Sequence, residues 1–267
     1  MATKIINAYF IECITNMHVG SGDANYGVVD KLVQRDPVSN YPTIHASSLK
    51  GAMREHFERL WGADSAKVND IFGKEAKDGR DSASGEYQFF GADLAALPVR
   101  SNFKQFALTV CTELIMLVNR KSQLLTGHDV FQTGLIKDRL YSKMKPSYEV
   151  YLEDELFGVE NHASLLLCSA IGSLGDRFAV AEDTKFSGFA SSLPVIARNQ
   201  LDNGISKNLW YEEIVPHQSV FVTYIASSGK YLDEFEAGLL PGGQTIQVGG
   251  NASVGYGICK FHKISFA

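Results

Sequence analysis

The sequence has 267 residues, of which 45% are hydrophobic and 21% are charged, so it predicts a folded protein and excludes disorder over most of the chain. At about 150 residues per domain, this length allows one large domain or two small ones. With 25 basic and 30 acidic residues the net charge is −5, which argues against non-specific nucleic-acid binding by the whole surface. A local basic groove is still allowed, because residues 119–147 contain six basic and two acidic residues, a net charge of +4.

Three further features bear on where the protein works. We expect no signal peptide, because residues 1–17 lack an apolar core and a small-residue cleavage site. The uncharged run over residues 161–175 is shorter than the roughly 20 apolar residues of a membrane span. The four cysteines are scattered and form no CxxC motif, which argues against a disulfide framework and a zinc ribbon. We therefore expect a soluble, cytoplasmic protein with no membrane contact.

The first 62 residues are predicted to contain a strand, a loop and a helix. Residues 4–13 mix β-branched and aromatic residues, which is typical of a strand, and a glycine-containing loop over 15–40 follows. Ser47 or Ser48 can then cap a helix that Gly62 ends. Its apolar residues recur at helical spacing: Leu49, Met53, Phe57 and Leu60.

The rest of the chain predicts an α+β fold. Residues 64–95 are rich in Asp, Ser and Gly and are expected to be an insertion, while 105–118 contain a strand or a helix that periodicity alone does not separate. Further elements are a helix over 163–174, a strand over 220–226, a helix over 231–240, and strands over 245–248 and 257–266. This order suits a split βαβ or ferredoxin-like core with large insertions.

Asp30 is the first candidate site residue. It lies in a loop with Gly20, Gly22 and Gly27, where the backbone could approach phosphates and a carboxylate could bind a metal or act as a base. The alternative is structural, because Asp30 could also pair with Lys31 or Arg35 or cap a turn.

Lys50 and Arg54 form a second candidate site. They are four residues apart near a predicted helix start, so they share one face where free N–H groups attract anions. Together they could clamp a phosphate, or they could simply be solvated charges.

Two further segments are candidates for a functional role. The glycine-rich run 247–257 could let backbone amides reach a phosphate or an RNA backbone, although a tight hairpin with bulges would explain it equally well. Asn203-Gly204 predicts a type I′ turn, and hence a projecting hairpin over about 196–213. The aromatic residues that close this hairpin could instead pack against the core.

Taken together, these segments resemble the RAMP-superfamily subunit that forms the repeated backbone of Cmr-type (type III-B) CRISPR effector complexes. The glycine loop alone would indicate only the superfamily, whereas GVVD with QRD, SLKG and WYEE is much more specific. In chain order the matching segments are HVGSG from His18, GVVDKLVQRDP from Gly27, SSLKGAMRE from Ser47, PVRS from Pro98, LWYEEIVP from Leu209 and IQVGGNASVGYG from Ile246. The chain departs from the usual family pattern at His45-Ala46, after Ser101, and at Ile214.

The resemblance implies a single RAMP domain over 1–267, with a modified ferredoxin-like (RRM-like) palm, large insertions and a projecting β-hairpin thumb. It implies CRISPR guide RNA, target RNA, neighbouring copies of the chain and other Cmr subunits as partners. In the family a loop aspartate is needed for cutting target RNA, and here it corresponds to Asp30, with His18 and Glu212 as auxiliary candidates. A divalent cation, with Mg²⁺ as the expected one, is the implied cofactor, and its ligands are not predicted.

The resemblance also suggests the residues that bind RNA. The SLKG lysine that contacts guide RNA corresponds to Lys50, and the thumb would wedge between base pairs and set a regular cutting interval. Further expected RNA contacts are Arg54, Arg35, Ser48, Gly249, Gly250, Gly255 and Gly257, and the expected thumb residues are Arg198, Asn203, Gly204 and Trp210.

The expected function is therefore RNA-guided endoribonuclease activity within an assembled complex. The alternatives are a non-catalytic filament subunit of the same kind of complex and a guide-processing RAMP ribonuclease with histidine-based chemistry. A small-molecule phosphate enzyme is disfavoured, because the sequence contains no nucleotide-binding fingerprint.

Overall fold

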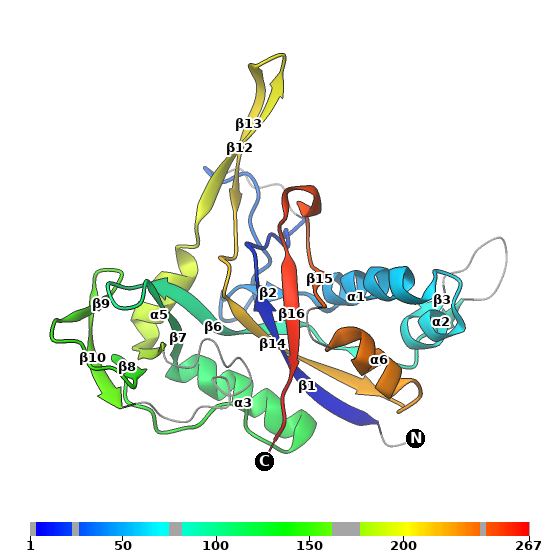
Figure 1. The fold of residues 1–267 in the computed structure, drawn as a ribbon, viewed down its shortest axis with the longest axis horizontal. Coiled ribbons are helices and arrows are strands. Elements are labelled where there is room, and N and C mark those ends of the chain that lie inside the picture. Colours follow the sequence, from blue (N-terminus) through cyan, green and yellow to red (C-terminus); the bar gives the residue numbers. More distant parts are fainter. Residues whose placement is uncertain (1–3, 23–26, 75–81, 162–176, 241–243, 267) are drawn as a thin grey trace.

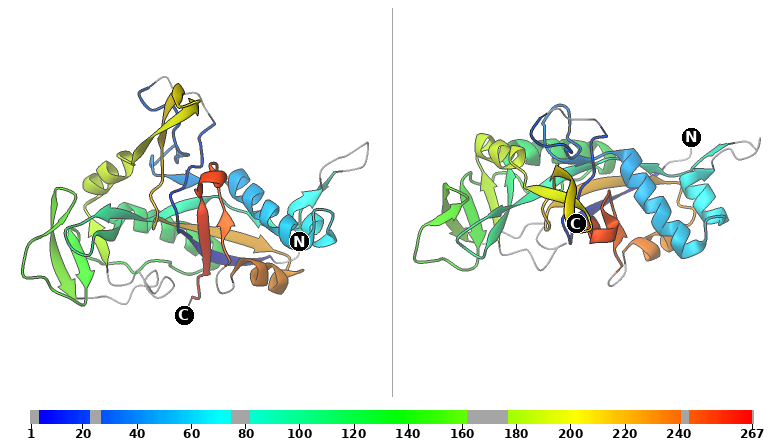
Figure 2. Two further views of the ribbon diagram at one scale, coloured as in Figure 1. Left: turned by 45° about the horizontal axis from the view of Figure 1, so that its top comes forward. Right: turned by 90° about the horizontal axis from the view of Figure 1, so that it is seen from above.

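The computed structural model describes residues 4–22, 27–74, 82–161, 177–240 and 244–266. The fold is α+β and is built on one large, mostly antiparallel sheet (Figures 1 and 2). Its helices are α1 (Ala46–Trp61), α2 (Ala66–Phe72), α3 (Thr112–Thr126), α5 (Asp183–Ser191) and α6 (Leu232–Leu239), with a 3-10 turn η1 (Ala252–Val254). Its strands are β1 (Ile5–Cys13), β2 (Thr43–Ile44), β3 (Gly73–Lys74), β4 (Ala83–Ser84), β5 (Gln88–Phe89), β6 (Ala92–Arg100), β7 (Phe106–Cys111), β8 (Arg139–Ser142), β9 (Val150–Leu152), β10 (Glu155–Asn161), β11 (Phe178–Ala181), β12 (Val195–Asp202), β13 (Ile205–Glu213), β14 (Val220–Ser227), β15 (Ile246–Gln247) and β16 (Ile258–Lys263).

The main sheet has the strand order β15-β16-β1-β14-β6-β7-β11-β8-β10-β9. Strand β14 is buried along its whole length between β1 and β6, as its β-branched and aromatic residues favour. Its neighbour β1 pairs with β14 on one side and β16 on the other, so the two ends of the chain meet in the sheet. This pairing brings the loop after β1 next to the glycine-rich loop before β16.

An aromatic cluster fixes α1, α2 and α6 to the sheet. The rings of Phe57 and Phe235 stack with centroids 4.8 Å apart, and those of Phe72 and Phe89 stack 5.0 Å apart. Stacked aromatic pairs add to the free energy gained from burying their apolar area. Helix α1 is thereby held at a fixed place beside the loops that carry the candidate site.

Helix α1 matches its predicted length but not its predicted cap. It begins at Ala46, after His45, and no side chain caps it, while Gly62 ends it as expected. Ser48 lies in the first turn, where its hydroxyl accepts a hydrogen bond from Gln34 at 3.0 Å. The buried face contains Leu49, Met53, His56 and Phe57, whereas Leu60 is 45% exposed.

Other expected elements are confirmed or adjusted. The strand over 4–13, the strand over 220–226, the helix over 231–240 and the two C-terminal strands are present. The segment 105–118 contains both alternatives, since β7 leads directly into α3. Residues 92–95 belong to β6 inside the main sheet and not to an insertion. The helix expected over 163–174 lies outside the described residues.

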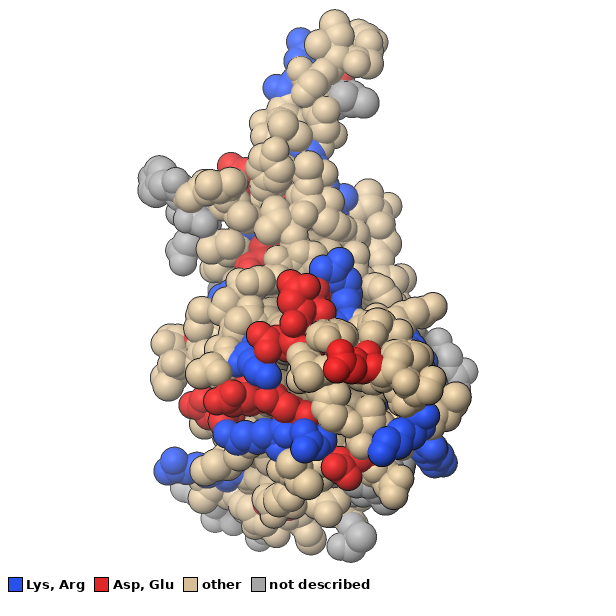
Figure 3. All heavy atoms as spheres, turned by 90° about the vertical axis from the view of Figure 1, so that its left-hand side faces the viewer, with Lys and Arg blue, Asp and Glu red and all other residues tan. Residues whose placement is uncertain are grey.

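The basic segment 119–147 does not keep its charges separate on the surface. Lys121 pairs with Asp93 at 2.7 Å, and Lys137 pairs with Asp183 at 2.6 Å. Figure 3 shows acidic and basic side chains in neighbouring bands on the face that carries β8–β10. Charge that is segregated along the sequence is therefore mixed in space. In the part of the chain that the structure describes, no helix is long and apolar enough to cross a membrane.

Candidate active site at the base of the projecting hairpin

Strands β12 and β13 form a hairpin that projects from the sheet (Figure 1). They pair from Val195↔Glu213 to Asp202↔Ile205, and the turn residues Asn203 and Gly204 have φ of 51° and 80°. Two successive positive φ angles are what a type I′ turn requires, so the hairpin predicted from Asn-Gly is confirmed. Its closing aromatics are not in the core, because Trp210 is half-buried and Tyr211 is exposed.

Asp30 lies against the base of this hairpin. The backbone N–H groups of Asp30 and Lys31 both donate to the carbonyl oxygen of Tyr211, at 3.1 Å each. In return the Tyr211 N–H donates to Asp30 Oδ2 at 2.7 Å, and the Glu213 N–H donates to the carbonyl oxygen of Lys31 at 2.9 Å. The loop is thus fixed along β13, and the Asp30 side chain is exposed. Its hydrogen-bond partner is the hairpin backbone and neither of the cations considered from the sequence.

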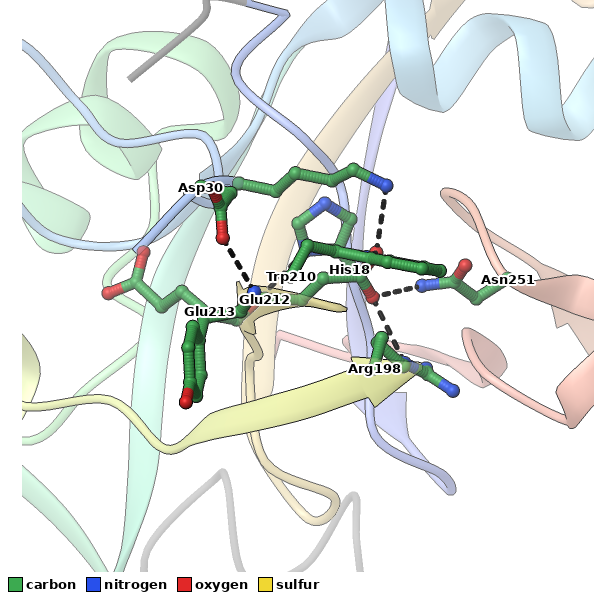
Figure 4. Close-up of polar contacts among 9 residues, drawn as sticks. His18, Asp30, Arg198, Trp210, Glu212, Glu213 and Asn251 are labelled. Carbon is green, nitrogen blue, oxygen red and sulfur yellow. Dashed lines mark hydrogen bonds and ion pairs between the residues drawn. The ribbon is translucent and has the colours of Figure 1, made fainter. Parts of the chain in front are cut away.

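Glu212 is buried at the centre of a polar cluster (Figure 4), with a side chain that is 1% exposed. Its Oε1 accepts from Lys31 at 3.0 Å and from Trp210 at 2.8 Å, and its Oε2 accepts from Arg198 at 3.2 Å and from Asn251 at 2.8 Å. Burial alone would raise the pKa of Glu212, but hydrogen bonds from Trp210, Lys31 and Asn251 and the charge of Lys31 outweigh it and lower the pKa to about 2. Glu212 therefore stays ionised at neutral pH and joins four segments of the chain.

His18, the other auxiliary candidate, is also buried, at 7% exposure. Its Nδ1 lies 2.7 Å from the carbonyl oxygen of Glu213 and, since a carbonyl only accepts, Nδ1 carries the hydrogen. The backbone carbonyl of His18 accepts from the Gly250 N–H at 2.9 Å. His18 thus connects the loop after β1 to the hairpin and to the glycine-rich loop, and its ring is not open to a ligand.

The guanidinium of Arg35, one of the expected RNA contacts, is bound within the chain itself. It pairs with Glu213 and also donates to the carbonyl oxygens of Asn40 at 2.8 Å and Ala190 at 2.9 Å. The side chain is only 16% exposed. The second oxygen of Glu213 accepts from the Val33 N–H at 3.1 Å, so this pair is a structural bond between the Asp30 loop and β13.

Lys50 and Arg54 lie one turn apart on α1 as predicted, but only one of them has a free head group. Arg54 donates to Glu58 at 2.7 Å and to the carbonyl oxygen of Gly73 at 3.0 Å, so it holds α1 to the start of β3. Lys50 is half-buried and has no hydrogen bond or ion pair within the described residues. The expected two-cation clamp is therefore reduced to Lys50.

The glycine-rich loop packs mainly on its own chain. A Cβ at Gly249 would lie 2.4 Å from the carbonyl oxygen of His18, and one at Gly257 would lie 2.0 Å from that of Val248. At Gly255 a Cβ would meet nothing within 4 Å. Two of these glycines are thus needed for close packing, whereas Gly255 faces open space.

The side chains near Asp30 offer few free ligands for the expected divalent cation. Among the described residues no group of three or more His, Cys, Asp or Glu side chains could hold a metal ion. Glu212 and Glu213 already accept hydrogen bonds at both carboxylate oxygens. The residues present therefore do not fit a metal site made by the protein alone.

Sequence reasoning missed two members of the site. Lys31 was considered only as a possible partner of Asp30, yet its ammonium belongs to the Glu212 cluster. Asn251 lies in the glycine-rich loop with φ of 64° and reaches the same carboxylate. The position of Lys31 beside Asp30 and the amide side chain directly after Gly249-Gly250 were the available signals.

Comparison with known proteins shows consistent similarities. A model of the RAMP superfamily matches residues 10–260. The chain is 26% identical over 273 residues to the CRISPR system Cmr endoribonuclease Cmr4 of Pyrococcus furiosus, covering 92% of each chain. A chain of the type III-B Cmr-beta complex in its apo state has a similar fold, with a TM-score of 0.80 at 21% identity over 98% of both chains. A chain of the type III-B Cmr-beta complex bound to cognate target RNA is also similar, with a TM-score of 0.78 at 22% identity over 99% of both chains.

Proposed function

The chain belongs to the RAMP superfamily, and from this premise we propose that it is a guide-RNA-binding backbone subunit of a type III-B CRISPR effector complex that cuts complementary target RNA. The similarity to a Cmr endoribonuclease over 92% of both chains supports this assignment. So does the similarity to a Cmr-beta chain from a complex with cognate target RNA. In this proposal the partners are guide RNA, target RNA, further copies of the chain and other Cmr subunits, in the cytoplasm.

The observation that carries the catalytic part is the exposed carboxylate of Asp30 at the hairpin base. Both its backbone and its Oδ2 are fixed by Tyr211, so the carboxylate has a defined direction before RNA binds. A group that is held in place in advance lowers the entropic cost of reaching the reactive geometry. His18 and Glu212 are buried, which supports Asp30 as the residue that contacts the reacting atoms.

The chemistry proposed is attack of a target 2′-oxygen on the adjacent phosphorus. The new bond joins the 2′-oxygen to phosphorus, the bond to the 5′-oxygen breaks, and the leaving 5′-oxygen takes up a proton. Asp30 aligns the 2′-hydroxyl and accepts its proton, a form of general-base help worth about 10²–10⁴-fold. Sequence selection comes from base pairing with the guide, so the protein needs only backbone and shape contacts.

The projecting hairpin is proposed to act as a thumb on a modified ferredoxin-like palm. Its apolar side chains reach solvent, with Ile205 67% and Leu209 54% exposed. Apolar side chains inserted between base steps unstack and kink a duplex. A wedge of this kind next to Asp30 would set the interval between cuts. A Mg²⁺ ion at this place would need ligands from RNA as well as Asp30, because Mg²⁺ commonly binds one or two carboxylates together with phosphates and water.

The test is cleavage by the assembled complex containing Asp30→Asn. A labelled complementary RNA should be bound and left intact, with and without divalent ions. The control is Asp64→Asn, which changes an exposed aspartate just after α1 and should cut at the wild-type rate. Full cutting by Asp30→Asn would overturn the catalytic assignment, and a wild-type complex that binds target without cutting would favour the non-catalytic filament subunit.

A guide-processing ribonuclease with histidine chemistry is less well supported. His18 is buried and its Nδ1 contacts a carbonyl, so it lacks the access that such a role needs. Cleavage of precursor RNA by the purified chain alone would favour that alternative.

A further inference from the structure

Lys31 is the outer cation of the buried cluster around Glu212. Its Nζ lies 3.0 Å from Glu212 Oε1 and 5.0 Å from the centre of the Trp210 ring. The Lys31 side chain is 52% exposed, against 21% for Arg198, the second cation that pairs with this carboxylate. Figure 4 shows a cluster assembled from the Asp30 loop, both hairpin strands and the glycine-rich loop.

The cluster contains more positive charge than Glu212 requires. One carboxylate faces two cations, while the other two donors, Trp210 and Asn251, are neutral. If Lys31 turned away, Glu212 would keep a compensating guanidinium and three hydrogen bonds. Lys31 is therefore available to an anionic ligand without leaving an unpaired buried charge, which would otherwise be costly.

A cation beside Asp30 would offset the negative charge that this residue presents to RNA. An RNA phosphate that approaches Asp30 is repelled by its carboxylate, because like charges at short range disfavour each other. Arg35 does not compensate, since it is bound to Glu213 and two carbonyl oxygens. Lys31 is adjacent in sequence to Asp30, and lysine supplies a compact charge on a flexible stem.

We propose that Lys31 is a phosphate-binding residue of this site, whose ammonium contacts a target-RNA phosphate beside Asp30 and stabilises the charge that develops during cleavage. The proposal rests on the proposed function. Cations aimed at developing negative charge are among the strongest contributors to catalysis. A phosphate contact of this kind carries no sequence information.

The experiment compares Lys31→Met and Lys31→Arg in assembled, guide-loaded complexes. Methionine keeps the apolar stem over Trp210 and removes the charge, while arginine keeps the charge. We expect Lys31→Met to slow single-turnover cleavage by about 10²-fold or more. It should also reduce the slope of log target affinity against log salt by about 0.7, the contribution of one phosphate contact to a single strand. Lys31→Arg should stay within about tenfold of wild type.

Lys67→Met is the matched control. Lys67 on α2 also pairs with a glutamate, Glu234 at 3.3 Å, and also lies over a tryptophan, 5.6 Å from the Trp61 ring centre. Lys67→Met should change neither the cleavage rate nor the salt dependence of target affinity. A purely structural role for Lys31 would lower thermal stability and guide loading and leave the salt slope unchanged, and this result would overturn the proposal.

Cleavage by Lys31→Met at the wild-type rate would also overturn the proposal for Lys31. Asp30→Asn measured in parallel separates the two claims. If Asp30→Asn is inactive and Lys31→Met is not, only the role of Lys31 fails; if Asp30→Asn still cuts, the proposed catalytic function fails.

Discussion

Asp30 and Tyr211 hold each other by two hydrogen bonds that run in opposite directions. The Asp30 N–H donates to the Tyr211 carbonyl at 3.1 Å, and the Tyr211 N–H donates to Asp30 Oδ2 at 2.7 Å. A loop side chain is thereby fixed to the backbone of a strand, although 181 positions separate the two residues. The direction of the carboxylate is thus set by the hairpin.

This relationship separates the structural role of Asp30 from its chemical role. Asp30→Ala removes the acceptor for the Tyr211 N–H, whereas Asp30→Asn keeps an oxygen there. We expect Ala to lower the free energy of unfolding of the purified chain by about 1 kcal/mol and Asn by less, because a single hydrogen bond contributes about that much. Both variants should fail to cut target RNA. Denaturant unfolding gives the first comparison, and equal losses of stability would show that Oδ2 does not fix the loop.

Glu212 gives a prediction about pH. Its folded-state pKa of about 2 lies below the ordinary 4.5, so the ionised carboxylate stabilises the fold above about pH 4.5. That stabilisation is lost as the pH falls from 4.5 towards 2. Glu212→Gln should therefore lower the free energy of unfolding at pH 7 by about 3 kcal/mol, the equivalent of this shift, and the difference from wild type should shrink below pH 4.5.

The low pKa of Glu212 also leads to a prediction about the cleavage rate. Since Glu212 is ionised throughout the neutral range, Glu212→Gln should not change the shape of the pH–rate profile between pH 5 and pH 9, even if the rate falls. This is measured with complexes that retain their guide. If the profile of Glu212→Gln lacked an ionisation that the wild-type profile shows, Glu212 would be a residue that transfers a proton during cleavage.

The sequence predicts local features of this protein better than the partners of its side chains. Asn203-Gly204 specifies its turn because the required φ angles depend on those two residues alone. The partner of Arg35 was not predicted, because Glu213 is 178 positions away and nothing local indicates that pair. The predicted capping of α1 by Ser47 or Ser48 was wrong for a related reason, since the Ser48 hydroxyl is bound to the distant side chain of Gln34.

Arg54 and Lys50 illustrate the same limit within one helix. Their spacing correctly predicts a shared face, but Gly73, which accepts a hydrogen bond from Arg54, comes into reach only once α2 has folded against α1. Likewise, the charge excess of 119–147 is real in the sequence and is reduced when acids such as Asp93 and Asp183 fold against it.

Lys50 and Arg54 should consequently behave differently when replaced. Lys50→Ala is expected to weaken guide-RNA binding uniformly across guides and to reduce its salt dependence, because a phosphate contact is electrostatic and independent of sequence. Arg54→Ala should instead lower thermal stability, because it removes the bonds to Glu58 and Gly73. Filter binding over a salt series and thermal unfolding test the pair. The assignment fails if Arg54→Ala changes the salt slope as much as Lys50→Ala does.

Gly249 and Gly255 provide a matched test of the glycine-rich loop. Both have positive φ, 85° and 79°, so alanine carries a similar backbone cost of about 1 kcal/mol at either position. At Gly249 the new Cβ would also lie 2.4 Å from the carbonyl oxygen of His18, whereas at Gly255 it would meet nothing within 4 Å. Gly249→Ala should therefore be clearly the more destabilising change in denaturant unfolding.

Gly255 also tests whether the loop approaches RNA on its open side. In that case Gly255→Ala should weaken guide binding while the fold persists, since the methyl group would stand between the backbone and the ligand. Equal stability of the two variants would contradict the close packing against His18, and unchanged guide binding by Gly255→Ala would remove Gly255 from the RNA-binding surface.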